Sequence, residues 1–290
     1  MVPSTLLSIA QSLDQIESKR ITLPNGWSLT PVGKQITLGD LPLNIAVSPS
    51  KKLLAVTNNG QSDQSVLLID AATHHLLDSV TMGKSWLGLA FSSDEKSLYA
   101  SGGLDNLIVR FTIKKNKLIP ADTIKLGKKW PVNIGVAGIA VDDKHHLLYA
   151  VTKENNSLYV ADTRTNKVIG QYQLGGEGYT CILSPDNNML YVSCWGCEKV
   201  ALFDTRKQQF SGSIVVGSNP NDLCLTRDGS FLFVANSNDN SVSVIDVKKR
   251  SVIETLNTAL FSSSPSGSTT NSVALSEDNK TLYIANADNN

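Results

Sequence analysis

The chain has no excess of charge of either sign and no long apolar run. Its 290 residues contain 26 Lys and Arg against 26 Asp and Glu, so no basic field attracts duplex nucleic acid, and we expect none as a partner. No apolar segment approaches the length that crosses a bilayer, so we expect no membrane span. Both absences point away from nucleic-acid-binding and membrane-spanning proteins.

Residues that usually carry catalysis are scarce as well. The sequence contains no Gly-rich phosphate loop, no Ser-His-Asp constellation and no paired-carboxylate signature. Its four histidines form two pairs in polar turns, where exposed turn residues are a better interpretation than metal ligands. We therefore predict that this chain alone is not an enzyme, has no catalytic residue, and binds neither a cofactor nor a metal.

Four cysteines include a single Cys-x-x-Cys, formed by Cys194 and Cys197. A redox site would need a helix N-terminus to lower the thiol pKa, and a zinc site would need two more ligands. The segment lies instead in a predicted hairpin, so a local disulfide between Cys194 and Cys197 or two free thiols remain as alternatives. Cys181 and Cys224 fall inside apolar strands and are predicted to lie in the core.

What the sequence does contain is one strand pattern repeated six times. The units follow one another at intervals of 42 to 50 residues, and no helical periodicity interrupts them. Several short strands per unit at this period are typical of propeller blades, whose faces are buried only by stacking on neighbours. The second strand of each unit begins at a leucine: Leu54, Leu98, Leu148, Leu190, Leu232 and Leu282.

The spacing within a unit is more regular than the period. Seven positions before each leucine, an apolar residue closes another short strand, and turn-forming residues such as Ser184-Pro-Asp-Asn187 separate the two. A third strand usually ends in aspartate, as at Asp70 and Asp246, and a variable fourth strand runs to a glycine. The residues seven positions before the leucines are Val47, Phe91, Val141, Leu183, Leu225 and Leu275.

These strands carry a resemblance to a known family. Tyr191-Val-Ser193, Phe233-Val-Ala-Asn236 and Tyr283-Ile-Ala-Asn286 resemble the YVTN repeat of the YncE-like β-propellers, over about residues 28–290. Segments such as Gly83-Lys-Ser-Trp-Leu-Gly88 resemble bacterial proteins in which this propeller precedes an alkaline-phosphatase-superfamily phosphoesterase domain. The resemblance implies an all-β, seven-bladed propeller of four-stranded antiparallel blades and an extracytoplasmic, periplasmic location.

The chain departs from that family in how much of the ring it holds. We expect five near-complete blades, half of a sixth, and an orphan strand over Val32–Gly39 that resembles the fourth strand of a blade. Residues 1–19 are expected to be a lead or a signal remnant, and residues 20–290 a single propeller domain. We interpret the chain as a fragment of a longer product, with a premature natural end as the alternative; the phosphoesterase domain that the resemblance implies downstream is not in this sequence.

Strand order in a blade places the loop before the first strand and the turn between the second and third strands on one face. Aromatic and amide residues gather in these loops, which is a usual composition for a binding site, although turn asparagines also need no ligand. We expect either a non-catalytic module that binds a protein domain, a glycan or another polymer, or the propeller part of a phosphoesterase. The candidate residues are Trp86, Trp130, Tyr179, Trp195, Asn44, Asn58, Asn219, Asn221, Asn236 and Asn286.

Overall fold

The computed structural model describes residues 17–18, 20–22, 28–29, 34–129, 131–259, 261 and 269–287. By contacts, the chain divides into two compact units, Met1–Leu38 and Gly39–Asn290. This division falls later than the expected boundary after residue 19. The described part of the first unit contains a two-stranded antiparallel sheet of β1 (Ile21–Thr22) and β2 (Ser28–Leu29).

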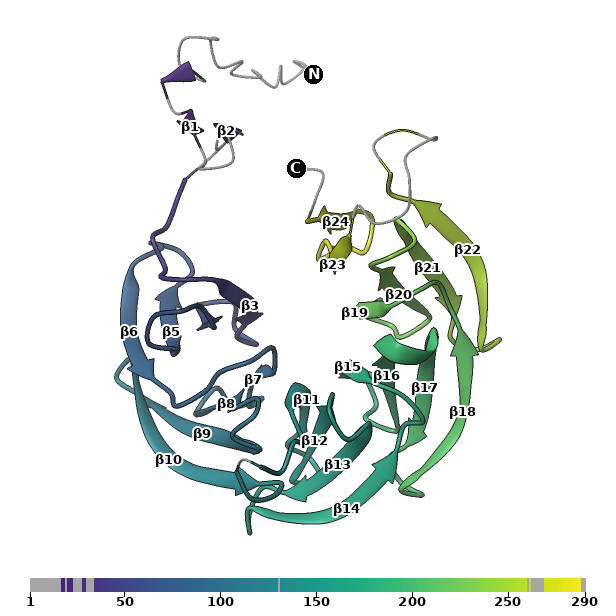
Figure 1. Cartoon of the computed structure of the whole chain (residues 1–290), viewed down its shortest axis with the longest axis horizontal. Coiled ribbons are helices and arrows are strands. Elements are labelled where there is room, and N and C mark those ends of the chain that lie inside the picture. Colours follow the sequence, from purple (N-terminus) through teal and green to yellow (C-terminus); the bar gives the residue numbers. More distant parts are fainter. Residues whose placement is uncertain are drawn as a thin grey trace, which may run out of the picture. The chain divides into compact units, whose positions relative to one another are not determined.

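The second unit is built from four-stranded antiparallel sheets, which confirms the all-β propeller prediction (Figure 1). Each sheet follows the order of the sequence and is called a blade. Blade 1 holds β3 (Pro42–Val47), β4 (Leu53–Asn58), β5 (Ser65–Asp70) and β6 (Leu76–Thr81). Blade 2 holds β7 (Leu89–Phe91), β8 (Ser97–Ser101), β9 (Leu107–Lys114) and β10 (Lys117–Lys125). Blade 3 holds β11 (Val136–Asp142), β12 (Leu147–Thr152), β13 (Ser157–Asp162) and β14 (Lys167–Gln173).

The remaining blades repeat this plan. Blade 4 holds β15 (Gly178–Leu183), β16 (Met189–Cys194), the short 3-10 helix η1 (Trp195–Cys197), β17 (Lys199–Asp204) and β18 (Gln209–Val215). Blade 5 holds β19 (Pro220–Leu225), β20 (Phe231–Asn236), β21 (Ser241–Asp246) and β22 (Ser251–Asn257). A sixth, two-stranded sheet pairs β23 (Thr270–Leu275) with β24 (Leu282–Asn286).

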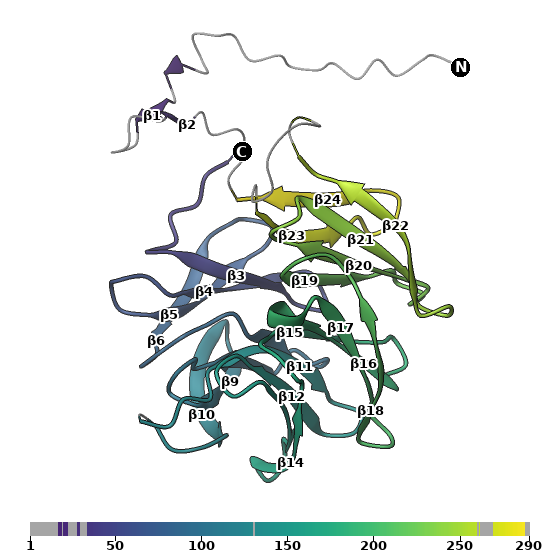
Figure 2. The same ribbon diagram turned by 45° about the vertical axis from the view of Figure 1, so that its right-hand side comes forward.

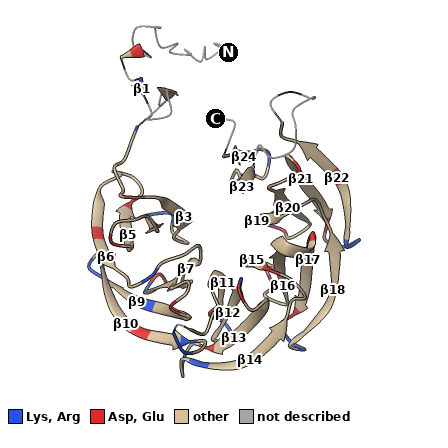
Figure 3. Cartoon of the chain, in the orientation of Figure 1, with Lys and Arg blue, Asp and Glu red and all other residues tan. Residues whose placement is uncertain are grey.

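First strands line the centre of this unit and fourth strands lie outside (Figures 1 and 2). Each first strand contacts that of the next blade, in the order β3, β7, β11, β15, β19 and β23. Charges of both signs are spread around the blades without segregation (Figure 3). Within the part of the chain that the structure describes, no helix is long and apolar enough to cross a membrane.

The seven-residue offset has a direct structural cause. In all six sheets the leucine of the second strand pairs with the residue seven positions earlier on the first strand, as Leu190 does with Leu183. A fixed hairpin register of this kind keeps the same side chains on the same face in every blade. The repeat in the sequence is therefore a repeat in strand pairing.

Aspartates that end the third strands hold the next turn. The carboxylate of Asp162 accepts hydrogen bonds from the backbone N–H groups of Arg164 and Thr165, and Asp70, Asp204 and Asp246 accept equivalent bonds. Arg164 and these backbone donors stabilise the charged form and lower the pKa of Asp162. These aspartates therefore form side-chain-to-backbone turns and belong to the scaffold.

The core lies between neighbouring blades. One apolar cluster joins Tyr149 and Val151 of blade 3 to Leu190 and Phe203 of blade 4, and similar clusters join the other adjacent pairs. The second-strand leucines of blades 2 to 5 are fully buried. Leu54 of blade 1 and Leu282 of the sixth sheet are only partly buried, and Leu282 packs against the apolar cluster that joins blade 5 to the sixth sheet.

The expected orphan strand is not present in its described part. Residues 34–39 form no strand, and residues 32 and 33 lie outside the described residues. A strand exists only where its backbone pairs with another strand, and no described strand pairs with this segment.

Candidate functional site

In blades 3, 4 and 5 the turn between the second and third strands is hydrogen-bonded to the loop that leads into the same blade. Lys153 N–H donates to Gly135 O at 2.9 Å, and Gly196 N–H donates to Glu177 O at 3.2 Å. Ser237 N–H donates to Asn219 O at 3.1 Å. The two loops of each blade therefore lie together on one side, called here the loop face, as the strand order predicts.

One pocket on this face has a volume of about 260 Å³ and is called the Trp195 pocket. Blades 3, 4 and 5 all contribute to it, and aromatic, amide and charged side chains meet there. Its lining is Lys153, Glu177, Gly178, Tyr179, Trp195, Asn221, Ser237, Asn238, Thr269 and Asn271.

Trp195 is held from both sides. It begins η1, whose Gly196 lies so close to the preceding loop that an added Cβ would be 2.9 Å from Glu177 Cβ. On the other side, Asn219 Nδ2 donates to Trp195 O at 3.1 Å. A residue larger than glycine at position 196 would push η1 away from this loop, so the indole position depends on that close approach.

The charge in the Trp195 pocket is paired. Lys153 Nζ lies 3.3 Å from Glu177 Oε1, and 5.7 Å from the centroid of the Trp195 ring. The first contact is an ion pair and the second a cation–π contact. Lys153 is therefore oriented toward Glu177 and Trp195, across the boundary between blades 3 and 4.

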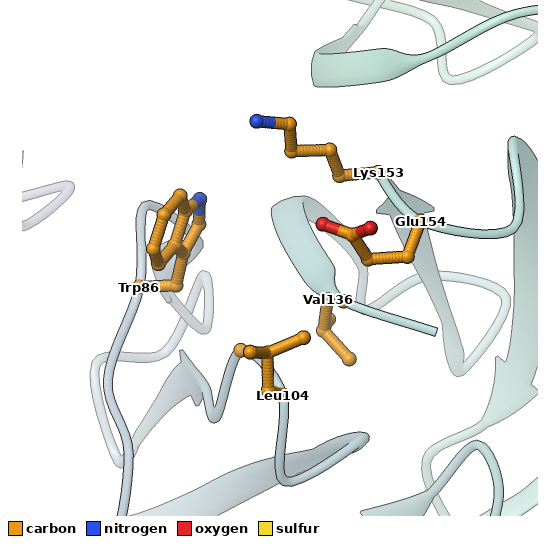
Figure 4. Close-up of a pocket in the computed structure, with 7 residues that line it drawn as sticks. Trp86, Leu104, Val136, Lys153 and Glu154 are labelled. Carbon is orange, nitrogen blue, oxygen red and sulfur yellow. The ribbon is translucent and has the colours of Figure 1, made fainter. Parts of the chain in front are cut away.

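A smaller pocket of about 70 Å³, called the Trp86 pocket, lies between blades 2 and 3 (Figure 4). Trp86, Gly103 and Leu104 come from blade 2, while Gly135, Val136, Lys153 and Glu154 come from blade 3. Gly103 has a φ of +48° and passes beneath the indole, where a Cβ would be 3.5 Å from Trp86 Cβ. Lys153 lines both pockets, so the two are neighbours on one face.

Most of the candidate asparagines hold the scaffold. Asn236 is fully buried and donates to Ser241 Oγ and Ser243 Oγ, both at 2.9 Å. Asn58 donates to Ser65 Oγ at 3.2 Å, and Asn286 donates to Thr258 O at 2.8 Å. Asn44 donates to Leu87 O at 2.6 Å, which joins blade 1 to the loop of blade 2. Of the ten candidate loop residues named in the sequence analysis, the structure brings Tyr179, Trp195 and Asn221 into the Trp195 pocket. Asn219 does not line this pocket but holds Trp195 by its hydrogen bond.

Tyr179 also reaches the centre of the propeller, where Asn44, Thr180 and Asp222 line a further small cavity. Burial raises the pKa of Tyr179, and the nearby Asp222 carboxylate raises it further. Burial likewise raises the pKa of Asp222. Its oxygens are occupied, because Oδ1 accepts from Leu223 N–H at 2.9 Å, and Oδ2 from Ser272 Oγ at 2.5 Å and Val273 N–H at 3.0 Å. Asp222 therefore joins blade 5 to the sixth sheet.

The raised pKa of Asp222 gives a pH prediction. A folded-state pKa above the unfolded value means that Asp222 stabilises the fold most at low pH, and that this contribution is lost as the pH rises through the folded pKa. The free energy of unfolding of the wild type, relative to Asp222→Asn, is therefore expected to increase between about pH 7 and about pH 4. Denaturant unfolding of both proteins across this range measures the difference.

Asp228→Asn is the matched control, because its pKa shifts the other way. Hydrogen bonds from Thr226 and Ser230 lower the pKa of Asp228 to about 2. Relative to Asp228→Asn, the wild type should lose stability as the pH falls. If the difference in free energy of unfolding between the wild type and Asp222→Asn instead decreases as the pH falls, the raised pKa of Asp222 is wrong.

The cysteines play no part in these pockets. Cys194 and Cys197 are free thiols, so the candidate disulfide between them is not formed in the structure. Cys194 ends β16 inside the core, where burial raises the pKa of its thiol to about 12, while Cys197 ends η1. Cys181 is buried, as predicted, and burial raises its pKa; Cys224 is partly buried. Among the described residues, no group of three His, Cys, Asp or Glu side chains is placed to hold a metal.

Sequence reasoning missed most of the pocket lining. Lys153, Glu154, Glu177 and Asn271 were not among the candidates, and Trp130 lies outside the described residues. The repeat itself carried a usable signal. The position five residues after each second-strand leucine lines one of the two pockets in four successive blades: Gly103, Lys153, Trp195 and Ser237.

This fold and its repeat define the class of protein: a β-propeller of four-stranded antiparallel blades. Residues 180–266 match the family model described as "Lactonase, 7-bladed beta-propeller". The chain is 30% identical over 195 residues to a Salmonella typhimurium protein described as uncharacterized protein YncE, covering 67% of this chain and 54% of that protein. It thus spans about half the length of this curated relative.

A solved structure shares the fold at low sequence identity. Hydrazine synthase from Kuenenia stuttgartiensis superposes with a TM-score of 0.69 at 18% identity, over 88% of this chain and 77% of that one. At this identity the likeness shows the propeller architecture alone.

Proposed function

We propose that the chain is a non-catalytic interaction module that binds a partner through its loop face. The observation that carries this proposal is the pair of neighbouring pockets walled by Trp86 and Trp195 and sharing Lys153. Partly exposed tryptophans beside amides supply stacking area and hydrogen bonds within one small region. A docked protein segment and a glycan chain both use such a surface, and these are the partner classes that we propose.

A catalytic role for this chain alone is not favoured. The group with a raised carboxyl pKa, Asp222, has its oxygens engaged by Leu223, Ser272 and Val273 and so is not free to move a proton. Turnover of a phosphodiester or a lactone by the purified chain, abolished by a point change within it, would refute this part of the proposal.

A narrower proposal follows from the sequence resemblance. The propeller would act beside a phosphoesterase domain of the alkaline-phosphatase superfamily, in the periplasm, with the loop face covering or feeding that domain. Support for it is the likeness of loops such as Gly83-Lys-Ser-Trp-Leu-Gly88 to propellers of that kind. Binding of a separately produced domain of this class to the loop face tests the idea directly.

The variant that tests the binding face is Trp86→Ala/Tyr179→Ala/Trp195→Ala. Removing three aromatic walls is expected to weaken partner binding by at least about 30-fold, as the loss of binding hot spots does. The measurement is the affinity for a phosphoesterase domain and for a glycan panel. Circular dichroism and a thermal melt establish whether the variant stays folded.

Tyr283→Ala is the matched control, because Tyr283 is 62% exposed and lies on β24, away from both pockets. It should bind as the wild type does. If the triple variant is folded and binds every wild-type partner unchanged, then the loop face is not the binding site.

A further inference from the structure

We propose that the Trp86 pocket takes a basic side chain of a partner protein, an ammonium or guanidinium group at the end of an aliphatic stem. This inference rests on the proposed function, because it assumes that the loop face meets a partner. It adds the chemistry of the group that enters, which neither the fold nor the similar proteins specify.

The small size of the pocket favours a slender group over a ring. Its volume is about 70 Å³, against ~150 Å³ for a cavity that holds benzene. Trp86, Leu104 and Val136 form its apolar walls (Figure 4). A slender methylene chain fits walls of this kind, whereas a sugar ring does not. The Trp195 pocket, at about 260 Å³, has room for larger groups than the Trp86 pocket.

The charge of the pocket selects a cation. Glu154 is exposed, and no hydrogen bond or ion pair to its carboxylate is found among the described residues. Lys153 lines the same pocket, but its ammonium is already paired with Glu177 at 3.3 Å. The uncompensated charge at the pocket is therefore the single negative charge of Glu154.

Glu154 is placed by its backbone. Its N–H donates to Ile134 O at 3.1 Å, and Lys153 N–H next to it donates to Gly135 O at 2.9 Å. Gly135 has a φ of +66°, and an added Cβ there would be 2.8 Å from Glu154 Cγ. The side chain thus lies over Gly135, and Figure 4 shows its carboxylate directed into the pocket toward Trp86.

An indole facing a carboxylate is a favourable site for an organic cation. The indole attracts the cation through its ring quadrupole, and the carboxylate adds an ion pair. Leu104, which is 51% exposed, then covers the methylene stem of the entering side chain. Neutral or acidic side chains gain only the apolar contacts, so the pocket discriminates by charge.

The experiment titrates the protein with Nα-acetyl-lysine methylamide, Nα-acetyl-arginine methylamide and the uncharged isostere Nα-acetyl-norleucine methylamide. Binding is followed by NMR at the indole N–H of Trp86, assigned with Trp86→Phe. We expect the basic probes to bind about tenfold more tightly than norleucine in the wild type, and this preference to fall sharply in Glu154→Gln, which keeps only the attraction of the indole. Equal binding of all three probes by the wild type would overturn the proposal.

Two controls separate this site from general electrostatics. Asp63→Asn removes one negative charge from an exposed turn on the same face, between β4 and β5, and should keep the full preference. Glu198→Gln should keep it as well, because Glu198 is exposed in the corresponding turn of blade 4, between β16 and β17, and does not line this pocket. If Asp63→Asn and Glu154→Gln weaken the preference for basic probes equally, then the probes are attracted by the charge of the whole loop face, and the Trp86 pocket is not a specific cation site.

Failure of this inference and failure of the proposed function give different results. If the aromatic triple variant loses its partner while Glu154→Gln keeps both partner and probe binding, the binding face stands and the basic-side-chain pocket is wrong. If the probes bind in a Glu154-dependent way but no partner depends on the face, the pocket stands and the proposed function is wrong.

Discussion

Leu190→Ala is expected to lower the free energy of unfolding by about 2–5 kcal/mol. Leu190 is fully buried in β16, and its side chain lies in the cluster that joins Tyr149 and Val151 of blade 3 to Phe203 of blade 4. Truncation leaves a cavity at the boundary between two blades. Because each blade is stabilised mainly by stacking on its neighbours, the loss falls on the contact that holds the two together. Denaturant unfolding of the two proteins measures it.

Leu76→Ala is the matched control for this change. Leu76 has the same side chain, but it is 52% exposed on the outer strand β6. Its truncation should change stability by no more than ~0.5 kcal/mol. Similar losses for both variants would show that Leu190 does not fill a tightly packed boundary.

Gly138→Ala is the second substitution with a large expected effect. A Cβ at this position would lie 2.4 Å from Thr180 Oγ1 and 2.5 Å from Thr180 Cα. The contact joins β11 to β15, the first strands of blades 3 and 4, at the centre of the propeller. One added methyl must therefore separate two backbones, and we expect a loss of about 1–3 kcal/mol or more in unfolding free energy.

A double substitution distinguishes backbone from side-chain crowding. In Gly138→Ala/Thr180→Ala the hydroxyl is gone but Thr180 Cα, now that of an alanine, still blocks the methyl. We expect most of the loss to remain. Full recovery of stability in the double variant would show that the side chain alone made the contact, and that the two strands are not held together by backbone proximity.

The scaffold was predictable because its determinants are periodic. The offset between Val141 and Leu148 recurs six times, and a recurring offset between two apolar positions means a fixed strand register. The closing aspartates, such as Asp204, were visible for the same reason. The partly buried leucines of blade 1 and the sixth sheet could not be anticipated, since their burial depends on what lies beside them.

The pockets were only partly predictable. Trp86 and Trp195 stood out because tryptophan is rare in turns, whereas Lys153 and Glu154 are what any exposed turn contains. Their importance comes from pairings across blades, such as the 3.3 Å contact between Lys153 and Glu177, which local sequence does not encode. The asparagines were wrongly weighted as candidates, because the sequence does not distinguish a buried asparagine that holds a turn, such as Asn236, from one that binds a ligand.

Because Lys153 forms a wall of both pockets, we expect the occupant of one pocket to change the affinity of the other pocket for its own occupant. A group that draws the ammonium away from Glu177 in the Trp195 pocket changes both the width and the net charge of the Trp86 pocket. Thermodynamic linkage makes the effect reciprocal: whatever factor the first occupant imposes on the affinity for the second, the second imposes on the first. Two separate partners, one in each pocket, should therefore change each other's affinity by the same factor. A single partner that fills both pockets at once shows no such pair of linked affinities.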